Sequence, residues 1–155
     1  MTDFLWKPGS WAAMFGSSDL NSLANGSTAF SSTTAPQIDT TSTLELYLQA
    51  EFVGGSISPT NAADVVFILV PRDSANAAYV DGEATSTVAN QPVWMQYPHA
   101  IIGLRTKATQ AQLAMSPLIM LPPNRYKAML LNRAGVALAS SGNQVNARLV
   151  TEKGV

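Results

Sequence analysis

The sequence predicts an all-β fold, an antiparallel sandwich or barrel, and three observations support this prediction. Short apolar segments recur between turn residues about every 8–12 positions, a spacing typical of such folds. Several of these segments alternate apolar with polar residues, as half-buried strands do. Strands and helices do not alternate along the chain, so a parallel sheet with crossover helices is not expected.

The clearest predicted strand spans residues 43–52, where the side chains alternate in character. Its apolar members are Leu44, Leu46, Leu48, Ala50 and Phe52. Successive side chains of a strand point to opposite faces, so these five are expected on one buried face. Gly54-Gly55 is expected to end the strand, since glycine weakens strand interiors.

The next predicted strand, Val65–Val70, is apolar at every position. We expect it at the centre of a sheet, covered on both faces by the second sheet, by the N-terminal segment or by a partner. Pro71 should end its ladder. Residues 72–90 form a long polar loop with Asp81-Gly82 as its turn, and loops of this length often make contacts.

The remaining elements are short. A strand pair is expected around Asn25-Gly26, turns at 132–135 and 140–143, and a frayed tail over 151–155. The sequence favours a strand over 112–121, while a short helix over 107–115 stays open because Ala, Gln, Leu and Met favour helices. The other predicted strands are Pro92–Pro98, Ala100–Thr106, Arg125–Leu131, Val136–Ala139 and Val145–Val150.

Residues 1–18 form a predicted apolar N-terminal arm, and residues 19–155 form the β-sandwich domain. The arm is broken by glycine and serine and is too short for a stable lone helix. Its large apolar side chains must be buried, either on their own domain or on a neighbouring subunit. They are Phe4, Trp6, Trp11, Met14 and Phe15.

Composition narrows the possible partners. The chain has 155 residues, no cysteine and a net charge of −1, and only 12% of its residues are charged. A disulfide framework is therefore impossible, and no basic stripe suits a nucleic acid. The closest basic pairs, Arg105/Lys107 and Arg125/Lys127, are interpreted as solvated strand faces. No secretion leader and no apolar run long enough for a membrane span is visible, so no membrane partner is expected.

Catalytic and metal-binding patterns are weak. His99 is the only imidazole, the strained Gly-x-Ser-x-Gly turn is absent, and His99 is expected at a strand start near the surface. Asp73, Asn76 and Asp81 lack the spacing of a calcium loop. Glu45 and Glu51 would lie roughly 20 Å apart on a strand, too far for paired carboxylate catalysis. We therefore expect no enzyme, no catalytic residue, no cofactor and no metal.

Several turns resemble those of a known family. The run Leu121-Pro122-Pro123-Asn124-Arg125-Tyr126-Lys127 leads into Leu131-Asn132-Arg133-Ala134-Gly135 and on to Ala139-Ser140-Ser141-Gly142-Asn143. Asn21–Ser27 and Tyr79–Gly82 belong to the same pattern. Together they resemble small tailed-phage virion proteins, in particular capsid decoration (cement) proteins of jelly-roll build. The Trp-rich first 18 residues have no counterpart in this pattern.

The resemblance implies a jelly-roll-like sandwich that binds the major capsid protein on the outside of the virion after synthesis in the host cytoplasm. It also implies a homo-oligomer, with a trimer as the first expectation. The residues expected to contact partners are Trp6, Trp11, Met14, Phe15, Arg72, Asp73, Tyr79 and Asp81.

Two alternatives remain open from the residues. One is a carbohydrate- or receptor-binding module of a phage tail or fibre, which an exposed Trp94 beside a groove would favour and a glycan array would test. The other is a hydrolase that uses His99, which an unchanged phenotype after His99→Ala would remove.

Overall fold

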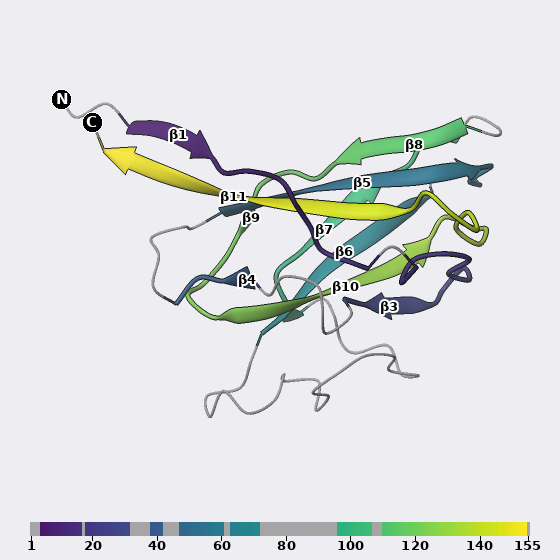
Figure 1. Cartoon of the computed structure of the whole chain (residues 1–155), viewed down its shortest axis with the longest axis horizontal. Helices are drawn as coiled ribbons and strands as arrows, with labels where there is room; N and C mark the ends of the chain where they lie inside the picture. Colours follow the sequence, from purple (N-terminus) through teal and green to yellow (C-terminus); the bar gives the residue numbers. More distant parts are fainter. Residues whose placement is uncertain are drawn as a thin grey trace.

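The computed structural model describes residues 4–16, 18–31, 38–41, 47–60, 63–71, 96–106 and 110–154. This part of the chain contains no α-helix and forms two antiparallel sheets packed face to face (Figure 1). The predicted all-β sandwich is therefore confirmed. The strands are β1 (Phe4–Pro8), β2 (Ala12–Ala13), β3 (Thr28–Phe30), β4 (Ile38–Asp39), β5 (Tyr47–Ile57), β6 (Asp64–Pro71), β7 (His99–Gly103), β8 (Gln110–Met115), β9 (Ile119–Met120), β10 (Arg125–Arg133) and β11 (Gln144–Gly154).

Each sheet is built around two long neighbouring strands. Sheet A has the order β1-β11-β5-β8, and β2 also pairs with β11 while β9 also pairs with β5. Sheet B has the order β3-β10-β6-β7, and β4 also pairs with β10. Strands β1, β3, β7 and β8 therefore end the two ladders.

The main core lies between the sheets. The predicted alternation along β5 is confirmed over its described part, because Leu48, Ala50 and Phe52 are almost fully buried. They pack in one cluster with Val65, Phe67 and Leu69 of β6. Alternate positions on each strand thus meet across the sandwich, as the period of two predicts.

Sheet B is apolar on both faces. Side chains on the face turned away from sheet A form a second buried cluster, against which Tyr97 packs. The cluster contains Phe30, Val66, Ile68, Val70, Met129 and Leu131. The prediction that residues 65–70 form a central strand is confirmed, because β6 lies between β10 and β7.

The interpretation of Lys127 as a solvated strand residue is wrong. Lys127 is 5% exposed, and its Nζ lies 4.5 Å from the centre of the Phe30 ring. The strand that carries it is covered on both faces, so the side chain runs along apolar surface and places its charge over an aromatic face. Its neighbour Arg125 stays partly exposed and pairs with Asp39.

The expected end of the strand at Gly54-Gly55 is also wrong, since β5 continues to Ile57. Because they lack a Cβ, these glycines instead allow neighbouring atoms to approach the backbone of β5 closely. A Cβ at Gly54 would lie 2.7 Å from Phe52 Cε1, and one at Gly55 would lie 2.6 Å from Ala139 Cβ and overlap the Ser141 carbonyl oxygen. The register of β5 against β8 also shifts between Gly54 and Ile57.

Residues 134–143 connect β10 in sheet B to β11 in sheet A. Both turns predicted here are present, with φ of 77° at Gly135 and 75° at Gly142. The short strand predicted over 136–139 is absent, because this segment bonds to other loops rather than to a ladder. Leu138 N donates to Leu23 O at 3.0 Å, and Ser22 N donates to Ala139 O at 2.9 Å.

Asn132 links this connection to the turn around Gly26. Its side chain is buried and donates to Leu23 O and Val136 O, both at 2.8 Å, and accepts a bond from Ala134 N at 2.9 Å. Gly26 N donates to Asn132 O at 2.7 Å. The strand pair expected around Asn25-Gly26 is absent, because β3 pairs with β10 instead.

The two ends of the chain pair with one another. β1 lies antiparallel to β11 from Phe4↔Gly154 to Pro8↔Val150, so the tail predicted to fray continues as strand to Gly154 (Figure 1). β2 continues this pairing, with Ala12 opposite Ala147. The backbone of β1 and β2 therefore pairs with β11 of its own chain.

The strand predicted for residues 112–121 forms as β8 and β9, with a break at Ser116–Leu118. The helix considered over 107–115 is wrong, since residues 110–115 are strand. The strand expected over 100–106 forms as β7 and is shorter. Of the strand expected over 92–98, only residues 96–98 are described, and they are not in a strand.

Candidate interaction surfaces

Large apolar side chains are exposed at two separate places on sheet A. Four of them gather on and between the short strands β8 and β9, and we call these four residues the apolar edge. They are Leu113 (56% exposed), Met115 (52%), Leu118 (45%) and Met120 (66%). Ile101 on β7 and Trp11 beside β2 are the other exposed large apolar residues in the described part of the chain.

The strand register places the apolar edge on the outer face of sheet A. Leu113 lies opposite Val53, Met115 opposite Glu51, and Met120 opposite Tyr47. Residues opposite one another in a ladder share a face. The partners on β5 alternate with the core residues of that strand, so their face is turned away from sheet B.

A strand was predicted here from the sequence, but the exposed apolar surface was not. One sequence signal was available, because no charged residue occurs between Lys107 and Arg125. Charged side chains are a common device for protecting strands at sheet edges. Their absence over this stretch points to a surface that is not arranged to repel a neighbour.

The outer face of sheet A is polar between its two edges. Arg148 donates to Gln49 Oε1 through Nε at 3.1 Å and through Nη2 at 2.7 Å. Asn146 Nδ2 donates to Glu51 Oε2 at 3.1 Å. These cross-strand pairs satisfy their own polar groups, so the apolar side chains on either side are the stronger candidates for contact.

Trp11 is the second exposed place, at the side of sheet A opposite to β8. It is 37% exposed, and the Arg148 guanidinium lies 4.5 Å from the centre of its ring. One face of the ring is thus occupied by a cation, which fixes its orientation. Trp6 lies on the neighbouring edge strand β1, where its backbone pairs with Glu152.

Met14 and Phe15 need correction as partner-binding candidates. They are 2% and 4% exposed and belong to the main core of their own chain. Met14 N donates to Val145 O at 2.8 Å, which holds this segment against β11. Their apolar character is used within the domain, so neither offers surface to another molecule.

The other predicted contact residues, Arg72, Asp73, Tyr79 and Asp81, lie outside the described residues. So does Trp94, on which the carbohydrate-binding alternative depended. The calcium-loop candidate Asn76 also lies there. In the described part of the chain, no three acidic, histidine or cysteine side chains come together to hold a metal ion. The same part contains no helix with the length and hydropathy of a membrane span.

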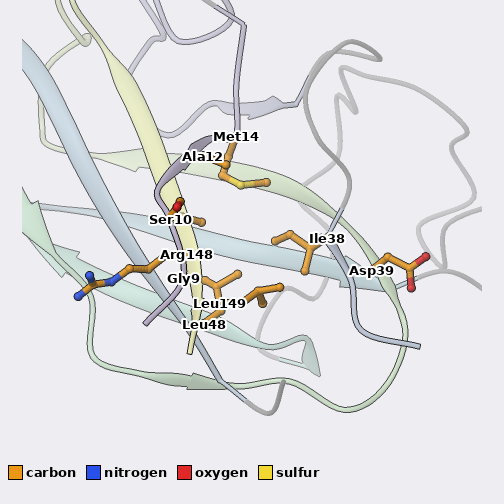
Figure 2. A pocket seen from close by; sticks show the side chains of 10 residues that line it. Gly9, Ser10, Ala12, Met14, Ile38, Asp39, Leu48, Arg148 and Leu149 are labelled. Atoms are coloured by element: carbon orange, nitrogen blue, oxygen red, sulfur yellow. The ribbon is translucent and has the colours of Figure 1, made fainter. Parts of the chain in front are cut away.

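A pocket of about 390 Å³ opens where β4 of sheet B approaches the first strands of sheet A (Figure 2). Its volume falls within the range of small-molecule sites. Its lining is mainly apolar, with few polar groups available to orient a ligand. The residues are Gly9, Ser10, Ala12, Met14, Ile38, Asp39, Leu48, Ala147, Arg148 and Leu149.

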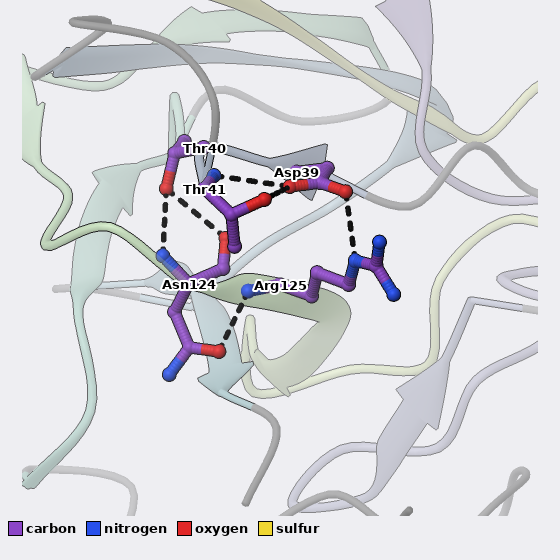
Figure 3. A network of polar contacts seen from close by, with 5 residues as sticks. All are labelled: Asp39, Thr40, Thr41, Asn124 and Arg125. Carbon is purple, nitrogen blue, oxygen red and sulfur yellow. Dashed lines mark hydrogen bonds and ion pairs between the residues drawn. The ribbon is translucent and has the colours of Figure 1, made fainter. Parts of the chain in front are cut away.

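Asp39, the carboxylate of this pocket, is already engaged in a polar network (Figure 3). Its Oδ1 accepts bonds from Thr41 N at 3.0 Å and Thr41 Oγ1 at 2.6 Å, and Arg125 Nε donates to its Oδ2 at 2.7 Å. The bonds from Thr41 and then the contact with Arg125 lower the pKa of Asp39 to about 2. Such a carboxylate stays ionised near neutral pH and is a poor proton donor.

Thr40 completes the network on its other side. Its hydroxyl donates to Pro122 O at 3.1 Å or Asn124 O at 3.0 Å, and it accepts a bond from Asn124 N at 2.9 Å. These contacts hold β4 against the segment that enters β10 (Figure 3). The arrangement is structural: it fixes the rim of the pocket.

His99 lies at the start of β7, as the sequence predicted, and it is half-buried. Its Nδ1 is 2.8 Å from Tyr97 O. A carbonyl oxygen only accepts hydrogen bonds, so this contact assigns the proton to Nδ1. The ring is thereby held by its own backbone two residues away.

Comparisons with protein-family models, with curated proteins and with solved structures gave no match. Function is therefore inferred from the sandwich, from its two exposed apolar places and from the sequence pattern of the turns.

Proposed function

We propose that this chain is a non-enzymatic structural protein of a tailed-phage virion, a decoration protein that binds the major capsid shell from outside and stabilises it. The turn pattern of residues 121–143 supports the virion assignment through its resemblance to such proteins. On this proposal the protein is made in the host cytoplasm, associates with itself and needs neither cofactor nor metal.

We also propose that the sandwich is a jelly roll, on the basis of its strand pairing. Three pairs of short strands, β1 with β2, β3 with β4, and β8 with β9, each pair with one common neighbour and act as one interrupted strand. Counted so, the first strand pairs with the eighth, the second with the seventh, the third with the sixth and the fourth with the fifth. This nested order corresponds to a long hairpin rolled into two sheets, an architecture used by capsid proteins.

One observation carries the functional proposal: the exposed apolar side chains lie at two opposite sides of sheet A. Trp11 lies beside β2, and the apolar edge lies along β8 and β9. Exposed apolar groups of this kind mark contacts with other proteins. A domain with such groups on two sides can touch two neighbours at once, which a protein that reinforces a repeating shell has to do.

Binding of many copies to one shell explains how weak individual contacts are enough for stable attachment. A small apolar contact supplies about 25 cal/mol per Å² of buried surface, most of which is offset by the entropy lost on association. When many linked copies bind one shell, the second contact of each assembly forms at a high effective concentration. We assign the Trp11 side to the shell, because Trp11 is the one aromatic side chain among the exposed large apolar residues in the described part of the chain.

The test uses empty shells of the phage whose genome encodes this chain. We expect the wild-type protein to sediment with the shells, and Trp11→Ser to reduce binding at least about tenfold, because aromatic anchors dominate protein contacts. Ile101→Ser is the matched control: it removes an exposed apolar side chain (51% exposed) from β7 and should bind like the wild type.

A point substitution is preferable to deletion of residues 1–18, which would also remove Met14 and Phe15 from the core. Equal loss in both variants would show that general surface hydrophobicity, and not the Trp11 side, drives sedimentation. Wild-type protein that stays in the supernatant at every concentration would contradict the proposed function.

A further inference from the structure

We propose that strand β8 pairs antiparallel with β8 of a second copy, across a twofold axis that passes beside Leu113. The pairing would join the two A sheets into one continuous sheet. It gives a defined interface to the self-association included in the proposed function, and it is tested on the free protein, so either proposal can fail alone.

First, β8 pairs with no strand of the described residues on the side away from β5. It ends the order of sheet A, with β5 on its other side. Ser116 N, which follows the strand, donates to Ala50 O at 2.8 Å, so Ser116 directs its backbone toward β5. Backbone groups of successive strand residues point to opposite sides. Ala111, Leu113 and Met115 therefore direct their N–H and C=O groups away from β5, along the free side.

The second step is that the strand is held in place before any partner arrives. Gln112, 1% exposed, points inward and ties β8 to Arg105, which lies shortly after the end of β7 at Gly103. It accepts a bond from Arg105 N at 2.9 Å and donates to Arg105 O at 3.3 Å. An edge that is already extended loses little further conformational entropy when it pairs.

The third step is that this edge lacks the usual protection. Natural sheet edges carry lysine, proline or bulges that discourage pairing, yet β8 contains no charged residue and no proline. Where the pairing of β5 with β8 shifts register, between Gly54 and Ile57, the extra residue lies on β5 and not on β8. Two copies would bring no like charges together along the strand. Pro117 lies just beyond β8 and has no N–H to donate, so it would limit the ladder to the strand itself.

The register between the two copies of β8 follows from the short length of the strand and from the end of the ladder before Pro117. Centring the twofold axis on Leu113 pairs each outward-directed residue of one copy with one of the other. Leu113 lies opposite its own equivalent, and Ala111 lies opposite Met115 of the second copy. Each such pair exchanges two backbone hydrogen bonds. A shift of the register in either direction would leave some of these backbone N–H and C=O groups unpaired, so this register forms the most hydrogen bonds between the two copies.

The same register gathers the apolar edge. Leu113 and Met115 are exposed on the outer face of sheet A, and residues opposite one another share a face. Leu113 of both copies would thus pack side by side on the outer face of the joined sheet, with Met115 close to Ala111 on either flank. The second copy therefore covers surface that the single chain leaves in water.

A six-residue edge is a small contact, below the ~1,600 Å² of a standard stable interface. We therefore expect a monomer–dimer equilibrium that depends on concentration rather than a permanent dimer. This differs from the trimer that the resemblance implies, and the twofold arrangement is the one that a strand paired with itself requires.

Cysteine cross-linking tests the register, and the absence of cysteine from the natural chain leaves no competing thiols. Leu113→Cys should give a disulfide-linked dimer under mild oxidation, since paired Cα atoms lie about 5.5 Å apart, within disulfide range. Met115→Cys alone should not, because its equivalent would lie about 14 Å away. A mixture of Ala111→Cys and Met115→Cys chains should cross-link to each other.

Ile101→Cys is the control for random collision, because it has similar exposure (51%) and lies on β7 of the other sheet. Equal cross-linking at positions 101 and 113, or efficient self-linking at position 115, would overturn the proposed register. Failure of both Leu113→Cys and the mixed pair to cross-link would overturn the pairing itself.

Sedimentation equilibrium and amide exchange supply an independent readout. Leu113→Lys should weaken dimerisation at least about tenfold, since it sets two like charges directly opposite one another, and Ile101→Lys should leave it unchanged. The amides of residues 111, 113 and 115 should gain protection as concentration rises, while that of Ser116 is protected throughout. A wild-type chain that stays monomeric up to about 1 mM would contradict the proposal.

Discussion

Asp64 and Asp39 show how single carboxylates respond in opposite ways to their surroundings. Asp64 begins β6 and is 9% exposed, and burial raises its pKa while the charge of Arg133 opposes the rise. Arg133 Nε lies 3.2 Å from Asp64 Oδ1, but without the geometry of a hydrogen bond. Asp39 is exposed, and hydrogen bonds from Thr41 lower its pKa to about 2.

The two carboxylates should therefore give opposite pH dependence of stability. Asp39 binds protons more weakly in the folded chain, so its contribution is present above about pH 4 and is lost as the pH falls toward 2. Asp64 binds protons more tightly when folded, so stability falls as the pH rises from about 4 through its raised pKa.

Calorimetric melting temperatures between pH 2 and pH 7, compared with the wild type, test this reasoning. Asp64→Asn should remove the loss of stability on raising the pH, and Asp39→Asn should reduce the loss on acidification. Solvent screens the exposed Asp39, so the effect of its substitution on stability should be modest. If both substitutions changed the pH dependence of the melting temperature in the same direction, the opposite pKa shifts assigned to Asp39 and Asp64 would be contradicted.

Individual turn residues could be predicted from the sequence, but the distant residues with which they form hydrogen bonds could not. The composition of residues 132–135 predicted a turn, and the positive φ of Gly135 agrees. Nothing in the local pattern indicated that the Asn132 side chain would bond to Leu23, 109 positions earlier. Likewise, the apolar character of Met14 and Phe15 was visible, but their burial in the core depends on where β11 lies.

The pattern of apolar residues along the sequence predicted the long strands well. β5, β6, β10 and β11 all appear where the pattern of apolar residues placed strands. The errors concern ends and connections: Gly54-Gly55 did not end β5, and residues 136–139 did not form a strand. In both cases contacts with distant segments decide the backbone, and no local propensity encodes such contacts.

Gly55→Ala tests the role of these glycines in strand β5. An added Cβ would overlap the Ser141 carbonyl and crowd Ala139, so the connection between the sheets must move. We expect a loss of about 2–3 kcal/mol in the free energy of unfolding, measured by urea denaturation. Gly103→Ala is the control, since its Cβ would meet nothing within 4 Å and should change stability by less than about 1 kcal/mol. Equal changes in the free energy of unfolding for the two substitutions would show that backbone entropy, and not crowding by the added Cβ, explains the effect at Gly55.

In the whole molecule, sheet A has an exposed apolar place on each of two sides, and each place can contact a neighbouring protein. The Trp11 side adjoins the paired ends of the chain, and the apolar edge lies at the other end of the strand order of sheet A, along β8. Fold class could be predicted from the spacing of strands and turns. The position of the exposed surfaces could not, because exposure depends on which strands end a sheet, and that order is set by pairings between residues far apart in sequence.

Cryo-electron microscopy of purified virions tests the proposed function, on the phage that is proposed to encode this chain. We expect density for this two-sheet sandwich on the outer surface of the shell, repeated with the symmetry of the capsid and contacting the major capsid protein through the Trp11 side. Capsids that carry no such density, or virions that contain the protein only in the tail, would contradict it.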